Sequence, residues 1–298
     1  MKSKKLIIAL LVAGMAVMVQ ASKTDVVKKS FVVEAGKQTI IDYSGVDDNV
    51  IIEKHDKNEI LFTFEKELKG SESKRNLEYF EDIHPEISFN NNSLEIEIKY
   101  PKFHFNLSQL FSGFDVDVKS RLIVPAAADL KIKLVDGDMD ISGVKGRVLL
   151  KTVDGNIEVK ECTGSIELEA IDGDIDIKRC SGSLKTNTVD GNVSAAGVFT
   201  AIDFNSVAGN GEFALEKGSR LSGDCYFHTN DGNVRLVFSK DMAFQLDFKA
   251  GDGGIRFSGI EFKNVTREND AYFQGQYGDG KYTIKVRTGD GDFYLKEL

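Results

Sequence analysis

The feature that most constrains this chain is a Val/Ile-Asp-Gly triplet that returns every 18 residues without a slip. It occurs at 135–137, 153–155, 171–173 and 189–191, and it fades to Val-Ala-Gly at 207–209. A second glycine follows nine residues after the first, at Gly146, Gly164 and Gly182, and Thr200 takes its place in the fourth unit. A fixed period of this length is typical of proteins built by stacking one structural unit on the next.

Largely apolar residues follow the same period. They form four columns: Met139, Ile157, Ile175 and Val193; Ile141, Val159, Ile177 and Ala195; Val148, Ile166, Leu184 and Ile202; and Leu150, Leu168, Thr186 and Phe204. Within each half of a unit these positions alternate with others, which is the period of a strand, and strands favour Val and Ile.

A single unit of two short strands cannot bury its apolar side chains, whereas stacked units align identical columns into one core. We therefore predict an all-β fold, a single-stranded β-solenoid or β-helix with about 18 residues per regular coil. We expect it to wind right-handed, the general preference for parallel crossovers. A β-sandwich is the alternative, but it would space its strands less regularly and would need no residue columns.

The segments on either side of the repeat predict further strands of the same domain. Alternating runs precede it, and Asp-Gly corners persist at looser spacing beyond residue 210. We expect one elongated domain over 22–298, with irregular coils at 22–120, regular coils at 121–209 and looser coils at 210–298. The first part carries inserts at 65–86 and 101–114. The second insert is interpreted as a lid over the end or side of the solenoid, and a partner-binding or lipid-touching flap is the alternative.

Residues 1–21 have the three parts of a secretory signal peptide. Lysines at 2, 4 and 5 precede an apolar run at 6–19, and Val19-Gln20-Ala21 offers short residues at the cleavage positions. An uncleaved anchor is the alternative, but a membrane span needs roughly 20 apolar residues. We expect export through a cleavable signal to the periplasm or the cell surface, with no transmembrane segment in the mature chain.

The charge of the chain excludes one class of partner. The formal net charge is −9, and removal of the signal peptide would make the mature chain more negative still. No basic run occurs beyond the first five residues. A nucleic acid is therefore not expected as a partner.

Acidic side chains also follow the period, in two columns at the corners. The first holds Asp136, Asp154, Asp172 and Asp190, and the second holds Asp138, Asn156, Asp174 and Asn192. We interpret both as turn chemistry, because Asp-Gly suits tight corners and Asp bonds neighbouring backbone amides. A calcium ladder that relieves carboxylate repulsion is the alternative, although the glycine-rich pattern of calcium-binding β-rolls is absent.

Cysteines and histidines do not form a recognisable reactive centre. Cys162 and Cys180 lie 18 apart in the column of Val144 and Val198, which favours buried core thiols, although stacked coils would also permit a disulfide. Cys225 has no partner by sequence logic, and no C-x-x-C motif occurs. The histidines, at 55, 84, 104 and 228, have no metal-ligand spacing. Arg147 and Arg179 break the repeat, but they are interpreted as solvated.

The strands before residue 100, the Arg121-Leu-Ile-Val-Pro125 lead-in and the serial Val-Asp-Gly-Asn/Asp-Ile units resemble a bacterial family. It is the "putative adhesin" family of β-strand-repeat proteins, a domain family of unknown function. The likeness covers roughly 30–298 and is strongest over 121–209. It implies an exported or envelope-associated β-solenoid, and it carries no catalytic residues over to this chain.

These observations predict an exported, non-enzymatic β-solenoid, an adhesin-like structural or binding protein of the cell envelope. A long regular face with repeated polar side chains suits an extended ligand, so the expected partner is an unidentified protein or glycan. No catalytic, cofactor-binding or metal-binding residue is assigned, and no cofactor is expected. The alternatives are a polysaccharide-active β-helix enzyme and a calcium-stabilised, β-roll-like surface protein.

Overall fold

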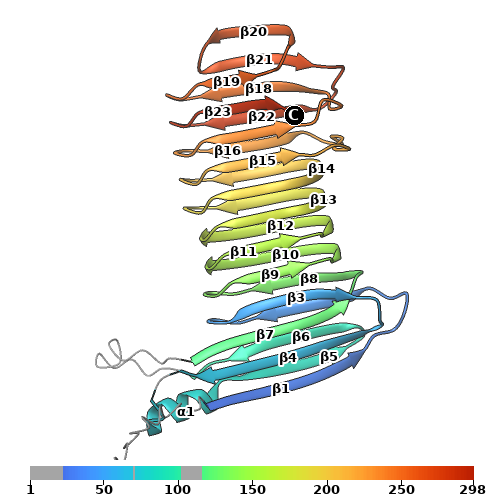
Figure 1. Ribbon diagram of the computed structural model, residues 1–298, viewed down its shortest axis with the longest axis vertical. Coiled ribbons are helices and arrows are strands. Elements are labelled where there is room, and N and C mark those ends of the chain that lie inside the picture. The colour runs from blue at the N-terminus through green and yellow to red at the C-terminus, as the bar shows by residue number, and fades with distance from the viewer. Residues whose placement is uncertain (1–22, 70, 102–115) are drawn as a thin grey trace, which may run out of the picture.

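The computed structural model describes residues 23–69, 71–101 and 116–298. The expected signal peptide at 1–21 and nearly all of the insert expected at 101–114 lie outside these residues. Within them the chain forms 23 strands and one helix, which confirms the all-β class. Figure 1 shows the strands as rungs of a tall stack with two faces, which we call face A and face B.

Face A is one continuous run of hydrogen-bonded strands. In spatial order it contains β5 (His84–Asn90), β6 (Ser93–Lys99), β2 (Thr39–Ser44), β8 (Ala128–Lys133), β10 (Lys145–Asp154), β12 (Thr163–Asp172), the second part of β13 (Ile175–Thr188), the second part of β14 (Val193–Ser206), β16 (Cys225–Thr229), β22 (Thr283–Thr288), β18 (Phe244–Ala250), β21 (Tyr272–Tyr277) and β20 (Lys263–Asn269).

Face B is built in the same way from the other half of each coil. Its spatial order is β1 (Lys23–Val32), β4 (Glu59–Leu68), β7 (Val116–Pro125), β3 (Asn49–His55), β9 (Met139–Ser142), β11 (Ile157–Lys160), the first parts of β13 and β14, β15 (Gly211–Leu215), β17 (Val234–Phe238), β23 (Phe293–Glu297) and β19 (Ile255–Ser258). The middle pairs are parallel, and antiparallel pairs occur towards both ends of the stack.

Residues 18 apart are neighbours in the regular part of the stack. Ile157 pairs with Met139 on one side and with Ile175 on the other, and Ile166 pairs with Leu184. These side chains are buried, so each predicted column lines the core. Between β14 and β16 the offset grows to 23, as in the pair of Phe204 and Phe227.

The order of the coils departs from the order of the sequence at both ends. The coil of β2 and β3 lies directly against that of β8 and β9, although four strands, β4 to β7, intervene along the chain. At the other end, β22 and β23 lie between the coil of β16 and β17 and the coil of β18 and β19. The last strands of the chain are therefore an inserted coil, visible as the dark red rungs in Figure 1.

Close approach between backbones explains the corner glycines. A Cβ on Gly173 would lie 2.0 Å from the carbonyl oxygen of Gly155, far inside any permitted contact. The same clash recurs through the inserted coil, where a Cβ on Gly291 would lie 1.8 Å from the oxygen of Gly232. Only glycine lets successive coils pack this closely at the corner.

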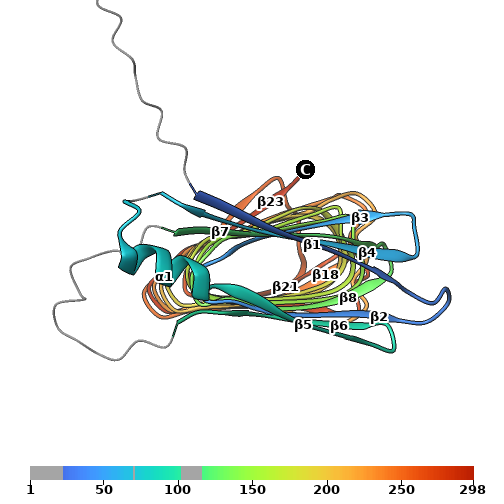
Figure 2. The same ribbon diagram turned by 90° about the horizontal axis from the view of Figure 1, so that it is seen from below.

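The helix α1 (Lys74–Asp82) lies at the N-terminal end of the stack, inside the insert expected at 65–86 (Figure 2). The Ser73 side chain accepts a hydrogen bond from the Asn76 N–H and caps the helix. Lys66 is buried beneath it and donates to the carbonyl oxygens of Phe80 and Ile83, at 2.6 and 2.7 Å. These bonds tie the end of the helix to β4.

Candidate functional site

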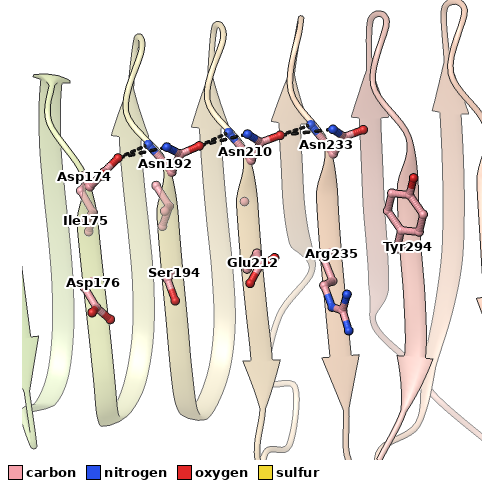
Figure 3. Close-up of a pocket in the computed structure, with 12 residues that line it drawn as sticks. Asp174, Ile175, Asp176, Asn192, Ser194, Asn210, Glu212, Asn233, Arg235 and Tyr294 are labelled. Atoms are coloured by element: carbon pink, nitrogen blue, oxygen red, sulfur yellow. Dashed lines mark hydrogen bonds between the residues drawn. The ribbon is translucent and has the colours of Figure 1, made fainter.

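A hollow of about 570 Å³ opens on face B, where β13, β14, β15, β17 and β23 lie side by side (Figure 3). We call it the face B groove. Its lining residues are Asp174, Ile175, Asp176, Asn192, Val193, Ser194, Asn210, Gly211, Glu212, Asn233, Arg235 and Tyr294.

One wall of the groove is a ladder of hydrogen-bonded side chains at the corner. The Asp174 Oδ1 accepts from both the backbone N–H and the Nδ2 of Asn192, at 2.8 and 3.1 Å. Asn192 accepts in the same way from Asn210, and Asn210 from Asn233. The dashed lines in Figure 3 follow this ladder. Each coil therefore fixes the corner of the next.

The ladder continues beyond the groove in both directions. Its further members are Asn49, Asp138 and Asn156 on one side and Asp292 and Gly254 on the other. The second acidic column predicted from sequence thus forms inter-coil hydrogen bonds. The first column, from Asp136 to Asp190, is exposed. Among the residues that the structure describes, no group of three or more His, Cys, Asp or Glu side chains could hold a metal ion.

The floor of the groove is where the surface pattern of face B changes. On the preceding coils Lys160 and Lys178 form ion pairs with a row of acidic neighbours, as between Lys160 and Glu158 at 2.6 Å. Ala196 and Ala214 then occupy the lysine row. Loss of the long side chains hollows the surface and removes the counter-ions.

The acidic row also changes at this point. It runs from Asp176 through Ser194, Glu212 and Arg235 to Tyr294, one residue per coil. Within the part of the chain that the structure describes, Ser194, Glu212 and Arg235 have no hydrogen-bond or ion-pair partner through their side chains. A hydroxyl, a carboxylate and a guanidinium therefore line the groove with their bonding capacity unused.

Tyr294 closes the groove with a ring that its neighbours hold in place. Its hydroxyl donates to Asp292 Oδ2 at 3.0 Å, and Arg256 pairs with the same carboxylate at 2.9 Å. The Arg256 guanidinium also lies 5.4 Å from the centre of the Tyr294 ring. Asp292 also accepts a hydrogen bond from the Gly254 N–H, and this bond holds the pKa of Asp292 below its ordinary value. The ring is thus positioned before any ligand arrives.

The remaining residues considered in the sequence lie outside the groove. Cys162, Cys180 and Cys225 are buried free thiols, and burial raises the pKa of Cys225 to about 11. Cys162 donates its backbone N–H to the Cys180 sulfur at 3.4 Å. His55, His84 and His228 lie on β3, β5 and β16, and His104 lies outside the described residues. Arg147 and Arg179 are exposed, and Arg179 pairs with Glu161.

Sequence reasoning missed one buried acid. Asp48 is 1% exposed, and neither carboxyl oxygen has a hydrogen-bond partner among the described residues. Burial raises the pKa of Asp48 to about 8, and the neighbouring Ser120 hydroxyl acts in the opposite direction. The pairing of Asp47 with Asp136 places Asp48 in the column of corner glycines next to Gly137. Alignment of Asp47-Asp48-Asn49 with Asp136-Gly137-Asp138 was the signal that could have found it.

Comparison with known proteins adds the fold and the family. None of the curated proteins matches this chain. Among solved structures, the chain is similar to a "putative adhesin" from Bacteroides fragilis, with 12% identity, a TM-score of 0.50 and coverage of 91% of this chain and 97% of that one. A "putative adhesin" from Parabacteroides merdae shares 11% identity at a TM-score of 0.47, over 92% and 96% of the two chains. At this identity the first likeness shows a shared fold and nothing about a ligand.

In the described part of the chain, no helix is long and apolar enough to span a membrane. The resemblance to the bacterial family of β-strand-repeat proteins is confirmed by a family model that matches residues 8–296. That match covers nearly the whole chain, and the protein therefore belongs to the Toastrack DUF4097 family.

Proposed function

We propose that this protein is an exported, non-enzymatic, adhesin-like binding protein of the cell envelope, and that the face B groove receives an extended polysaccharide strand. A cleavable signal at 1–21, one elongated domain over 22–298 and right-handed coils of about 18 residues belong to the same proposal. The observation that carries it is the row of Ser194, Glu212 and Arg235, whose side chains have no partner within the described chain.

The chemistry of this row suits the hydroxyl groups of a sugar chain. Glu212 accepts hydrogen bonds, Arg235 donates them, and Ser194 does both. Neighbouring strands in a sheet lie roughly 4.8 Å apart, so the row offers one polar group per coil along the stack. A long ligand that crosses the coils can therefore engage several groups at once, and Tyr294 gives it an aromatic contact at one end.

The arrangement favours binding over catalysis. A nucleophilic serine needs a general base within hydrogen-bonding reach, and no hydrogen bond joins Ser194 to a base among the residues described. The ladder from Asp174 to Asn233 uses its side-chain oxygens to accept from the next coil. That wall supplies rigidity rather than a second reactive acid.

The test compares Arg235→Ala with Arg179→Ala, which removes the same charge at an exposed site outside the groove. Both variants and the unmodified protein are titrated with a panel of neutral and acidic polysaccharides. Loss of a charge-assisted hydrogen bond should weaken binding by about tenfold in the first variant only. Equal losses in both variants, or no binding by the unmodified protein, would contradict the proposal. New reducing ends in the same mixtures would instead establish the polysaccharide-active enzyme.

A further inference from the structure

A second trough lies on face A near the C-terminal end of the stack. Two hollows, of about 520 and 410 Å³, adjoin there and share Lys285 in their linings. The first lies over β14, β16 and β22, and the second lies mainly over β18, β21 and β22. Together they form one trough that crosses the inserted coil, on the opposite face from the face B groove.

Strand register gathers unlike side chains in this trough. Asp203 on β14 pairs with Tyr226 on β16, Tyr226 with Lys285 on β22, and Lys285 with Asp247 on β18. An acid, an aromatic ring, a cation and a second acid therefore stand side by side on four successive strands. The same row is already mixed on the preceding coils, where Glu167, Lys185 and Asp203 follow one another, and what the trough adds to it is the aromatic ring of Tyr226.

The charged groups of the trough are fixed in pairs. Lys285 Nζ donates to Asp224 Oδ2 at 2.9 Å, and the Thr283 N–H donates to the other oxygen of that carboxylate at 2.9 Å. These bonds hold the pKa of Asp224 below its ordinary value. Arg287 donates to both the side chain and the backbone carbonyl of Asp247, each at 2.8 Å. The pairs are partly exposed, so they contribute little to stability and mainly fix side-chain positions.

Tyr226 supplies an open aromatic surface beside these pairs. The residue is 45% exposed, and Lys285 Nζ lies 4.9 Å from the centre of its ring. The same ammonium lies 3.4 Å from the Tyr226 hydroxyl, so the lysine fixes the tyrosine as well as the carboxylate. A half-exposed ring beside preset donors and acceptors is typical of a binding surface with one apolar and several polar contacts.

The balance of charge decides the class of ligand. Lys285 is neutralised by Asp224 and Arg287 by Asp247, so neither cation is left free to bind an anion. Each pair still offers adjacent donors and acceptors, which match the adjacent hydroxyl groups of a sugar ring. In the adjoining hollow the amides of Gln245, Gln274 and Gln276 add groups that donate and accept alike.

We propose that the face A trough is a second binding site, which takes a neutral polyhydroxylated glycan. The Tyr226 ring stacks on the apolar face of one sugar, and its hydroxyl groups bond to Lys285, which Asp224 holds in place, and to the Asp247–Arg287 pair. The site is independent of the face B groove, because the two share no lining residue.

The test uses calorimetric titration of the full chain with neutral hexasaccharides of glucose, mannose and N-acetylglucosamine, and with a hexamer of galacturonic acid as the anionic probe. At least one neutral hexamer should bind with a Kd below about 1 mM. Tyr226→Ala should weaken that binding by about tenfold, whereas Tyr226→Phe keeps the ring and should stay within about twofold. Val135→Ala, an exposed apolar side chain that lines neither site, serves as the control and should leave it unchanged.

A second measurement does not depend on any variant folding. Amide shifts induced by the bound hexamer should cluster on β16, β18 and β22 rather than on β15 and β17. The proposal is wrong if no neutral hexamer binds below about 1 mM, if Val135→Ala weakens binding as much as Tyr226→Ala, or if the galacturonate hexamer binds more tightly than every neutral one. Shifts confined to face B would overturn it equally.

Discussion

Replacement of Asp48 by asparagine should stabilise this protein in neutral and alkaline solution. The Asp48 carboxyl lies in the core at the junction between the coil of β2 and β3 and the first regular coil. Burial strongly disfavours the charged form, and the neighbouring Ser120 hydroxyl offsets only part of that effect. The cost of ionising it should therefore appear as a loss of folding stability that depends on pH.

The sign follows from proton linkage. The pKa of Asp48 is raised from 3.8 to about 8 in the folded chain, so the folded state retains a proton that the unfolded state releases. Below pH 3.8 both states are protonated and the group has no effect. As pH rises from 3.8 to about 8, the unfolded state is favoured by about 1.4 kcal/mol per pH unit. At pH 7 the cost reaches about 4 kcal/mol as an upper limit, and above pH 8 it is constant.

An asparagine side chain at this position would keep the shape of the aspartate and remove the ionisation. Urea unfolding, followed by far-ultraviolet circular dichroism from pH 4 to pH 9, measures the free energy of both proteins. Asp48→Asn should match the unmodified protein near pH 4 and exceed it progressively up to pH 8. The control is Asp172→Asn, at an exposed corner, which should leave the pH dependence unchanged.

Two outcomes would refute this reasoning. If the unfolding free energies of Asp48→Asn and the unmodified protein differ by the same amount at pH 4 and pH 8, the carboxyl does not titrate as its burial requires. If the asparagine variant is less stable at pH 8, Asp48 is ionised and has found partners. Asp47, whose pKa is also raised by burial, is the neighbouring acid to examine in that case.

Three further outcomes are expected. Gly173→Ala should cost about 3 kcal/mol in urea unfolding, because its Cβ would lie 2.0 Å from a backbone oxygen of the adjacent coil, whereas Gly223→Ala, with nothing within 4 Å, should be nearly neutral. Asn192→Ala should cost about 1 kcal/mol in the same assay, since water replaces part of the lost ladder bonding at this exposed corner. Excess calcium should not shift the thermal midpoint, because one oxygen of each carboxylate in the second acidic column, Asp138 and Asp174, already accepts from a backbone amide of the next coil; a rise would establish the calcium-stabilised roll.

The regular coils could be predicted because their information is local and repeated. Each column needs only one kind of residue every 18 positions, so the pairing of Ile157 with Ile175 follows from the sequence alone. The order of coils at the ends could not be predicted in this way. The inserted coil carries the same Gly-Asp-Gly corner as the coil of β18 and β19, and an identical corner accepts either neighbour. The order of these coils must then be set by side-chain packing in the core. One such contact is between the Phe238 and Phe244 rings, which meet edge to face with their centres 4.9 Å apart.

The two candidate sites could not be predicted from the sequence, because neither is marked by a cluster of reactive residues. Sequence reasoning sought clusters of Asp, His or Cys, whereas the face B groove arises from the change of Lys178 to Ala196 and Ala214 along one row. That change is visible in the aligned units as a loss of charge. Arg235 and Tyr294 could not be added from sequence, because their neighbourhood depends on where the inserted coil lies.

The inserted coil links the unusual topology to both sites. Its strand β23 brings Tyr294 to the face B groove, and its strand β22 brings Lys285 and Arg287 to the face A trough. If β18 and β19 had instead stacked directly on β16 and β17, Arg235 would face Arg256 without an intervening ring, and Tyr226 would face Asp247 without Lys285. Neither set of contacts would then exist. Insertion of the last coil out of sequence order thus completes both surfaces, because it adds Tyr294 to the groove and Lys285 and Arg287 to the trough.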